Sequence, residues 1–174
     1  MDPATLYRVL DQLIERFATG AEPAALQTAR RQFETRRGRV FEDEDMWELA
    51  SACFVECFVL EGPKDAAAPP AAAALRDPAF EQSAVLAWLR SQRSLYRVVS
   101  LSEAEVEVDD LIGGAGFRVA EPRSFQGVDR GDVMEARLVG YDGAVYFGRG
   151  FFFHPSGAHA AIARHVRTIV DSGG

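Results

Sequence analysis

Beyond Ser94 the sequence changes to a period of two, and this stretch decides the fold. Residues 95–101 read LYRVVSL, residues 106–109 read VEVD and residues 117–119 read FRV. Apolar and polar residues alternate in these runs, and β-branched and aromatic residues are frequent, which is typical of short strands. The pattern continues in residues 133–141 and 145–153, on either side of a strong type I′ hairpin signal, Asp142-Gly143. The stretch therefore predicts five short antiparallel strands that form a small bent sheet or barrel.

Before Ser94 the sequence follows a helical period instead. Apolar residues recur at spacings of three and four from Leu6 to Phe17, and a second helix is predicted from Pro23 until Gly38 ends it. A third apolar stripe runs from Met46 to Phe58. A last helix, residues 155–170, has a narrow apolar stripe that can cover one side of the sheet. The fold class is therefore α+β, an N-terminal bundle of three or four helices followed by the sheet or barrel and capped by a C-terminal helix.

Changes in composition divide the chain into four parts. Residues 1–62 are the helical bundle. Residues 63–76 are rich in alanine and proline, which disrupts a continuous helix and leaves little to bury, so we expect a surface linker. Residues 77–94 are a bridging helix, and residues 95–174 are the β-rich lobe with the C-terminal helix.

Length, composition and charge limit the possible partners. The chain has 174 residues, 48% hydrophobic and 26% charged, which is ordinary for a soluble globular protein. Its net charge of −7 removes the usual attraction to phosphate backbones and anionic membranes, so the sequence disfavours both as partners. Another protein, or a second copy of this chain, is the expected partner. Lys64 is the one lysine among 19 basic residues, a bias that indicates a GC-rich bacterial genome.

Cysteine and histidine usage indicates a reduced protein without a metal site. Cys53 and Cys57 lie four residues apart in an apolar helix and are too few for a disulfide framework, which favours a cytoplasmic location. The N-terminus also lacks the basic and then apolar pattern of an export signal. A zinc site needs two further ligands, and the three histidines at 154, 159 and 165 are not spaced to supply them. We therefore expect no metal and no cofactor.

One glycine-rich run, Gly113-Gly114-Ala115-Gly116, resembles a phosphate-binding loop only superficially. Such loops lie between a strand and the first turn of a helix. Here the glycines are followed by another predicted strand, and no Gly-Lys-Ser/Thr motif is present. The run is therefore interpreted as a turn or bulge.

Two charged runs and two aromatic residues are the candidate interaction sites. The basic run consists of Arg30, Arg31, Arg36, Arg37 and Arg39, and the acidic run of Glu42, Asp43, Glu44 and Asp45. The basic run can bind phosphates or an acidic partner, although the neighbouring acids neutralise much of its positive field. The acidic run can be a docking patch or simply the charged start of a helix. Tyr146 and Phe152 would mark an interface if they are exposed, whereas a strand covered on both faces would bury them.

Without a coherent catalytic set, the sequence favours a non-enzymatic bacterial adaptor or regulatory protein that acts through protein-protein contacts. The first alternative is an OB-like barrel that binds single-stranded nucleic acid or a small ligand, with Tyr96, Phe117 and Arg118 stacking on a base. The second is a hydrolase or transferase in which His154 would activate Ser124 or Ser156.

Residues 95–155 also resemble a known module. The segments that carry the likeness are LYRVV, VDDLIGG, FRVAEPRS, GDVMEARLV and DGAVYF. They are similar to an uncharacterised β-rich module of bacterial proteins that also carry the SEC-C zinc motif. The cysteines of the SEC-C motif itself are absent here. The resemblance implies a compact accessory module without a known active site.

Overall fold

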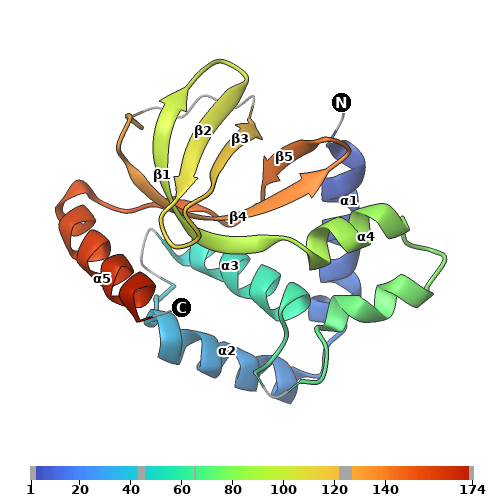
Figure 1. Cartoon of the computed structure of the whole chain (residues 1–174). Coiled ribbons are helices and arrows are strands. Elements are labelled where there is room, and N and C mark those ends of the chain that lie inside the picture. The colour runs from blue at the N-terminus through green and yellow to red at the C-terminus, as the bar shows by residue number, and fades with distance from the viewer. Residues whose placement is uncertain (1–2, 43–45, 65, 122–126, 173–174) are drawn as a thin grey trace. The chain divides into compact units, whose positions relative to one another are not determined.

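A computed structural model describes residues 3–42, 46–64, 66–121 and 127–172 of the chain. The chain divides into two compact units, Met1–Ser91 and Gln92–Gly174. The first unit is helical, and the second contains the sheet and the last helix (Figure 1). The α+β fold class predicted from the sequence is confirmed.

In its described residues, the first unit has four α-helices and two irregular helical turns. Helix α1, Ala4–Ile14, continues directly into a π-helical turn, Glu15–Thr19. The other α-helices are α2, Pro23–Arg37, α3, Trp47–Leu60, and α4, Gln82–Leu89. A 3-10 helix, Pro70–Arg76, precedes α4.

Helices α1 and α4 pack side by side and supply much of the core of the first unit (Figure 1). The apolar stripe of α1 is fully buried at Leu6, Leu10 and Leu13, as its helical spacing predicts. Trp88 of α4 is also fully buried, and its ring nitrogen donates a hydrogen bond to the Leu6 carbonyl over 2.8 Å. The predicted bridging helix is therefore a core helix of the first unit.

The alanine- and proline-rich segment differs from a simple surface linker. Within residues 63–76, the 3-10 helix Pro70–Arg76 buries Ala71 and Ala74 completely. Their small side chains allow close approach of the backbone to α3 and α4, which this turn contacts. These alanines bury little apolar area, but they let the 3-10 helix pack closely in the core.

The described part of the second unit contains six strands in one sheet. The strands are β1, Gln92–Leu101, β2, Glu105–Asp110, β3, Gly116–Ala120, β4, Val133–Tyr141, β5, Ala144–Phe147, and β6, Phe152–Phe153. Their order is β1-β2-β3-β5-β4-β6, and β1 also pairs with β4. The first five strands therefore close into a ring, as Figure 1 shows.

This ring is a Greek-key barrel. Strands β1, β2 and β3 form a meander, and β4 returns to lie beside β1, which is the Greek-key connection. Strand β5 then closes the ring against β3 through a parallel pairing of Val119 with Val145. The predicted all-antiparallel arrangement is wrong at this pair, because strand direction cannot alternate at every pair of a closed ring of five strands.

The predicted strand 145–153 is interrupted. Strand β5 ends at Phe147, and β6 begins at Phe152, with Gly148 and Gly150 in the break. Glycine weakens a strand interior, so the break falls where the sequence is least able to continue the ladder. The aromatic rings still cluster across it: Phe151 lies 5.3 Å from Phe147 and 6.4 Å from Phe153, centroid to centroid.

Both predicted turns are present. Asp142 and Gly143 have φ angles of +49° and +78°, as the type I′ hairpin between β4 and β5 requires. The glycine run forms the turn between β2 and β3, where Gly114 has a φ of +73°. Asp110 fixes this turn by accepting hydrogen bonds from the Ser94 hydroxyl at 2.7 Å and the Ile112 backbone N–H at 2.9 Å. The run is therefore a structural turn.

After β6, a 3-10 turn, Ser156–Ala158, leads into helix α5, His159–Asp171. The apolar stripe predicted for this helix is only partly covered. Val166 is buried, whereas Ile169 and Val170 are exposed.

Candidate interaction surfaces

The basic run does not form one uniform cationic cluster. Arg30 is partly buried, with its guanidinium carbon 4.9 Å from the ring centroids of both Trp47 and Phe54. It also donates a hydrogen bond to the Ser51 hydroxyl at 3.1 Å. A guanidinium placed over two aromatic faces and one acceptor joins α2 to α3. Arg30 therefore has a packing role. Arg31 is exposed and bonds to Thr28 on its own helix.

The remaining arginines lie at the end of α2 and just beyond it, where they are exposed. Arg37 covers the ring of Phe33 at 5.3 Å, and Arg39 covers the ring of Phe41 at 4.8 Å. Phe41 is 51% exposed despite this cover, and Met46, at the start of α3, is 41% exposed. We call Arg36, Arg37, Arg39, Phe41 and Met46 the arginine–aromatic surface.

The acidic run is described only at its first residue. Glu42 is exposed next to Phe41. Asp43, Glu44 and Asp45 lie outside the described residues, so their predicted role stays a prediction.

The two candidate aromatic residues of the second unit differ in exposure. Tyr146 is 4% exposed, so it does not mark an open interface. Tyr146 of β5 pairs in register with Val139 of β4, and Val139 is also buried. Phe152 is partly buried, with its ring centroid 5.1 Å from that of His154. Tyr146 is thus buried, and Phe152 is intermediate in exposure.

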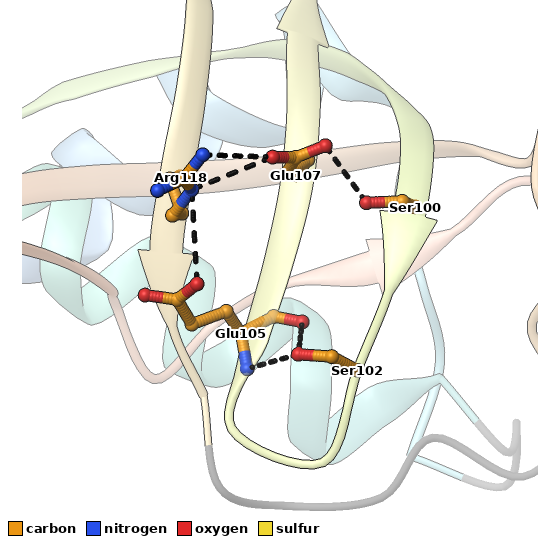
Figure 2. Close-up of polar contacts among 5 residues, drawn as sticks. All are labelled: Ser100, Ser102, Glu105, Glu107 and Arg118. Carbon is orange, nitrogen blue, oxygen red and sulfur yellow. Dashed lines mark hydrogen bonds and ion pairs between the residues drawn. The ribbon is translucent and has the colours of Figure 1, made fainter.

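The structure adds a charged surface that the sequence analysis did not single out. Figure 2 shows it on the outer side of β1, β2 and β3. Arg118 of β3 donates hydrogen bonds to Glu107 Oε1 of β2 at 3.3 and 3.4 Å, and Ser100 of β1 donates to Glu107 Oε2 at 2.8 Å. Arg118 also lies 3.7 Å from Glu105 Oε2. Ser102 closes the β1–β2 turn by accepting from the Glu105 backbone N–H at 3.1 Å.

The signal for this surface was present in the alternation of β2. Residues 105–110 read EVEVDD, and Val106 and Val108 face the barrel interior, so Glu105, Glu107 and Asp109 share the outer face. On the neighbouring strands, Arg97 pairs in register with Asp109, and Arg118 with Glu107. The surface therefore carries charges of both signs with more acids than bases.

Hydrogen bonding keeps the central carboxylate of this surface ionised. The Ser100 hydroxyl, and after it the Arg118 guanidinium, lower the pKa of Glu107. These partners favour the charged form, which accepts the hydrogen bonds of Arg118 across the strands.

The predicted base-stacking set is not assembled on this surface. Tyr96 is 1% exposed and belongs to the barrel core, where Phe117 packs edge-on against it at 6.2 Å. Burial, and secondarily the Asp110 carboxylate, raise the pKa of Tyr96. Arg118 is exposed but bonds to the two glutamates. Stacking of a nucleobase on Tyr96 would require the core to open.

His154 connects β6 to the last helix. Its backbone N–H donates to the Val133 carbonyl at 2.8 Å, and its own carbonyl lies 3.0 Å from the ring nitrogen of His159. The predicted nucleophile Ser156 is exposed at the start of the 3-10 turn, and Ser124 lies outside the described residues.

Within the described ranges, no three His, Cys, Asp or Glu side chains gather in a group that could hold a metal ion. In the same part of the chain, no helix combines the length and apolarity that a membrane span requires.

The geometry defines an α+β protein with a helical unit and a unit built on a closed Greek-key barrel. A model of a family of unknown function, DUF7986, matches residues 71–172. This match covers more than half of the chain, so the protein belongs to that family. It includes α4, the six strands and α5, and it gives no link to proteins with the SEC-C motif. No curated protein and no solved structure matches the chain.

Proposed function

We propose that this protein is a non-enzymatic adaptor or regulatory protein that acts through protein-protein contacts, with the arginine–aromatic surface as its contact region. The observation that carries the proposal is the exposure of Phe41 under Arg39, with exposed Arg36, Arg37 and Met46 close by in the sequence. Aromatic residues, methionine and arginine are the types enriched at protein interfaces, and aromatic and arginine side chains supply many hot spots.

The stacked arginines suit this role. Because Arg37 and Arg39 lie over aromatic rings, their long side chains have lost part of their freedom before a partner arrives. Binding then costs less conformational entropy. A partner segment that combines carboxylates with an apolar side chain fits this arrangement, since guanidinium groups pair with carboxylates in two-pronged hydrogen bonds.

The composition and the resemblance of residues 95–155 support the same proposal. An accessory module without an active site is what the resemblance to SEC-C-associated proteins implies. A protein with two cysteines and no disulfide framework suits the bacterial cytoplasm, where we take it to act. Its partner is another protein or a second copy of this chain.

Affinity capture from a bacterial lysate with matched variants tests the proposal. The test variant is Arg39→Glu/Phe41→Ser. The control is Leu75→Ser/Arg76→Glu, which makes the same charge reversal and a comparable replacement of an apolar side chain by serine at exposed positions elsewhere in the first unit. We expect wild type and control to retain a partner that the test variant loses by at least about tenfold, the effect of removing one hot spot.

Because all four positions are exposed, we expect both variants to keep the fold. Thermal melting of each variant checks this. A partner retained equally by the test variant would exclude this surface. Complete absence of a partner, together with a monomeric protein in solution, would contradict the adaptor role.

The barrel favours a second candidate, a ligand-binding role. Five-stranded Greek-key barrels of the OB type bind ligands on the outer face of strands 2 and 3. Here that face carries Glu105, Glu107, Asp109 and Arg118. Its acidic excess favours a cationic ligand over a nucleic acid.

A further inference from the structure

The β1–β2 hairpin of the second unit ends in residues that combine an apolar side chain with carboxylates. Residues 101–105 read LSEAE, and every one of them is exposed. We call them the hairpin tip. Leu101 is 38% exposed, although it belongs to β1. The hairpin tip therefore presents a leucine and the glutamates Glu103 and Glu105 to solvent, and it contains no basic residue.

The backbone of the hairpin tip is held by its own hydrogen bonds. The Ser102 N–H and hydroxyl donate to the Glu105 carbonyl at 2.9 and 3.0 Å. The same hydroxyl accepts from the Glu105 N–H at 3.1 Å, as Figure 2 shows. Because this turn is already fixed, the hairpin tip loses little conformational freedom when it binds to another surface.

The glutamates of the hairpin differ in the charges that they meet. Glu105 and Glu107 lie 3.7 and 3.3 Å from nitrogens of Arg118. Glu103, at the end of the hairpin, forms no ion pair with any residue that the structure describes. A cation on another molecule can therefore pair with Glu103 without breaking an ion pair inside the chain.

The arginine–aromatic surface of the first unit offers the complementary groups. The Arg39 guanidinium lies 4.8 Å from the centre of the Phe41 ring and forms no ion pair with a described residue. Phe41 is 51% exposed beneath it. In both places a charged and an apolar side chain are two residues apart in sequence, and the charges of Arg39 and Glu103 are opposite. The two places therefore match in charge and in apolar character.

The charge of the whole chain restricts how two copies can meet. With a net charge of −7, two copies repel each other over most of their surfaces. The basic run that ends at Arg39 is a local exception to this acidity. Contact between copies is therefore most favourable where the basic surface of one copy faces an acidic surface of the other.

We propose that the arginine–aromatic surface binds the hairpin tip of a second copy of this chain, with Arg39 paired to Glu103 and Phe41 packed against Leu101. This inference rests on the proposed function and names a second copy as the partner. Because the two contacting surfaces differ, the contact is heterologous. Each copy offers both surfaces, so the copies associate head to tail.

Sedimentation velocity of the full chain over a concentration series tests the proposal. We expect the average mass to rise with protein concentration. It should fall when salt is added, because salt screens the attraction between exposed charges.

Two double variants each remove one side of the contact. The surface variant is Arg39→Glu/Phe41→Ser, and the tip variant is Leu101→Ser/Glu103→Arg. Either one should lower the association constant at least about tenfold, the effect of losing one hot spot. Circular dichroism checks that both variants keep their fold, and the single changes Arg39→Glu and Glu103→Arg replace a double variant that does not.

Two controls make comparable changes at exposed positions outside the contact. Leu75→Ser/Arg76→Glu is the control in the first unit, and Ile112→Ser/Asp129→Arg is the control in the second. Both should associate as the wild-type chain does.

Mixing the two variants is the most specific part of the test. The surface variant keeps an intact hairpin tip, and the tip variant keeps an intact arginine–aromatic surface. Neither variant should associate alone, whereas an equal mixture should form pairs. A contact in which each copy uses the same single surface would not be restored by mixing.

Three results would each overturn the proposal: a wild-type chain that stays monomeric at every concentration, a variant that associates as the wild type does, or a mixture that stays monomeric. The proposed function is judged separately by affinity capture. If the wild-type chain is monomeric but captures another protein through the arginine–aromatic surface, the adaptor role stands and only the second copy is excluded as its partner.

Discussion

At the scale of single residues, the arginines show why spacing alone does not define a binding site. The run from Arg30 to Arg39 looks uniform in sequence, yet each guanidinium has a different neighbour. Arg30 lies between two rings, whereas Arg36 bonds to the Gln32 carbonyl on its own helix. The sequence could predict a basic cluster here. It could not predict which arginine is used for packing, because Trp47 and Phe54 approach α2 only through the tertiary fold.

Replacing Arg30 by lysine tests that packing role. Arg30→Lys keeps the charge but removes the planar group that lies over Trp47 and Phe54 and reaches Ser51. We expect a loss of about 1–2 kcal/mol in the free energy of unfolding, measured by urea denaturation. Arg31→Lys, one residue further on an exposed side of α2, should change it by less than about 0.5 kcal/mol. Equal effects of the two replacements would contradict the packing role of Arg30.

At the scale of elements, helix starts depend on side-chain caps that the sequence reveals only in part. A helix from Asp77-Pro78 was the expectation, whereas α4 begins at Gln82. Glu81 fixes that start, because its carboxylate accepts hydrogen bonds from the Ser83 and Ala84 backbone N–H groups at 3.2 and 2.7 Å. Glutamate is not among the preferred capping residues, so this boundary was not apparent in sequence.

This cap makes the stability of α4 depend on pH. The Ala84 backbone N–H, which is its strongest partner, lowers the pKa of Glu81 from the ordinary value of 4.5. A carboxyl whose pKa is lower in the folded state stabilises the fold above its unfolded pKa, and this stabilisation is lost as the pH falls through the folded pKa. We therefore expect Glu81→Gln to lower the melting temperature at pH 7. The difference in melting temperature between this variant and wild type should become smaller as the pH falls below about 4.5.

Glu22→Gln is the matched control for this prediction, since Glu22 occupies the same position before α2 but makes no capping hydrogen bond with its side chain. Its melting temperature should follow wild type at every pH. A constant difference between Glu81→Gln and wild type from pH 7 to pH 3 would show that the charge of Glu81 contributes nothing.

For the strands as well, the local sequence predicts some features, and the tertiary fold decides others. Alternation predicted the inner and outer faces of β2, and the positive φ angles that Asp142-Gly143 favours predicted the β4–β5 hairpin. The parallel pairing of β3 with β5 depends on the return of β4 to β1, which no local pattern encodes.

At the scale of the whole molecule, the net charge of −7 and the barrel's outer face lead to the same expectation for nucleic acids. The five strands of the ring close into a Greek-key barrel. Binding of single strands by such barrels needs a basic groove and exposed aromatic rings. Here Tyr96 is buried in the core and the outer face of β2 carries Glu105, Glu107 and Asp109.

We therefore predict that the protein does not bind single-stranded DNA even at low salt, where electrostatic attraction is strongest. Fluorescence anisotropy of a labelled oligothymidine should stay constant as the protein is added. The variant Glu105→Lys/Asp109→Lys reverses two charges on the same face and should produce binding that falls steeply with salt, because each neutralised phosphate releases a counterion. Binding gained by this variant would show that the negative charge of this face, and not the shape of the barrel, prevents binding of the oligonucleotide. Salt-sensitive binding by the wild-type chain would instead mean that a nucleic acid reaches a surface other than the acidic face of β2.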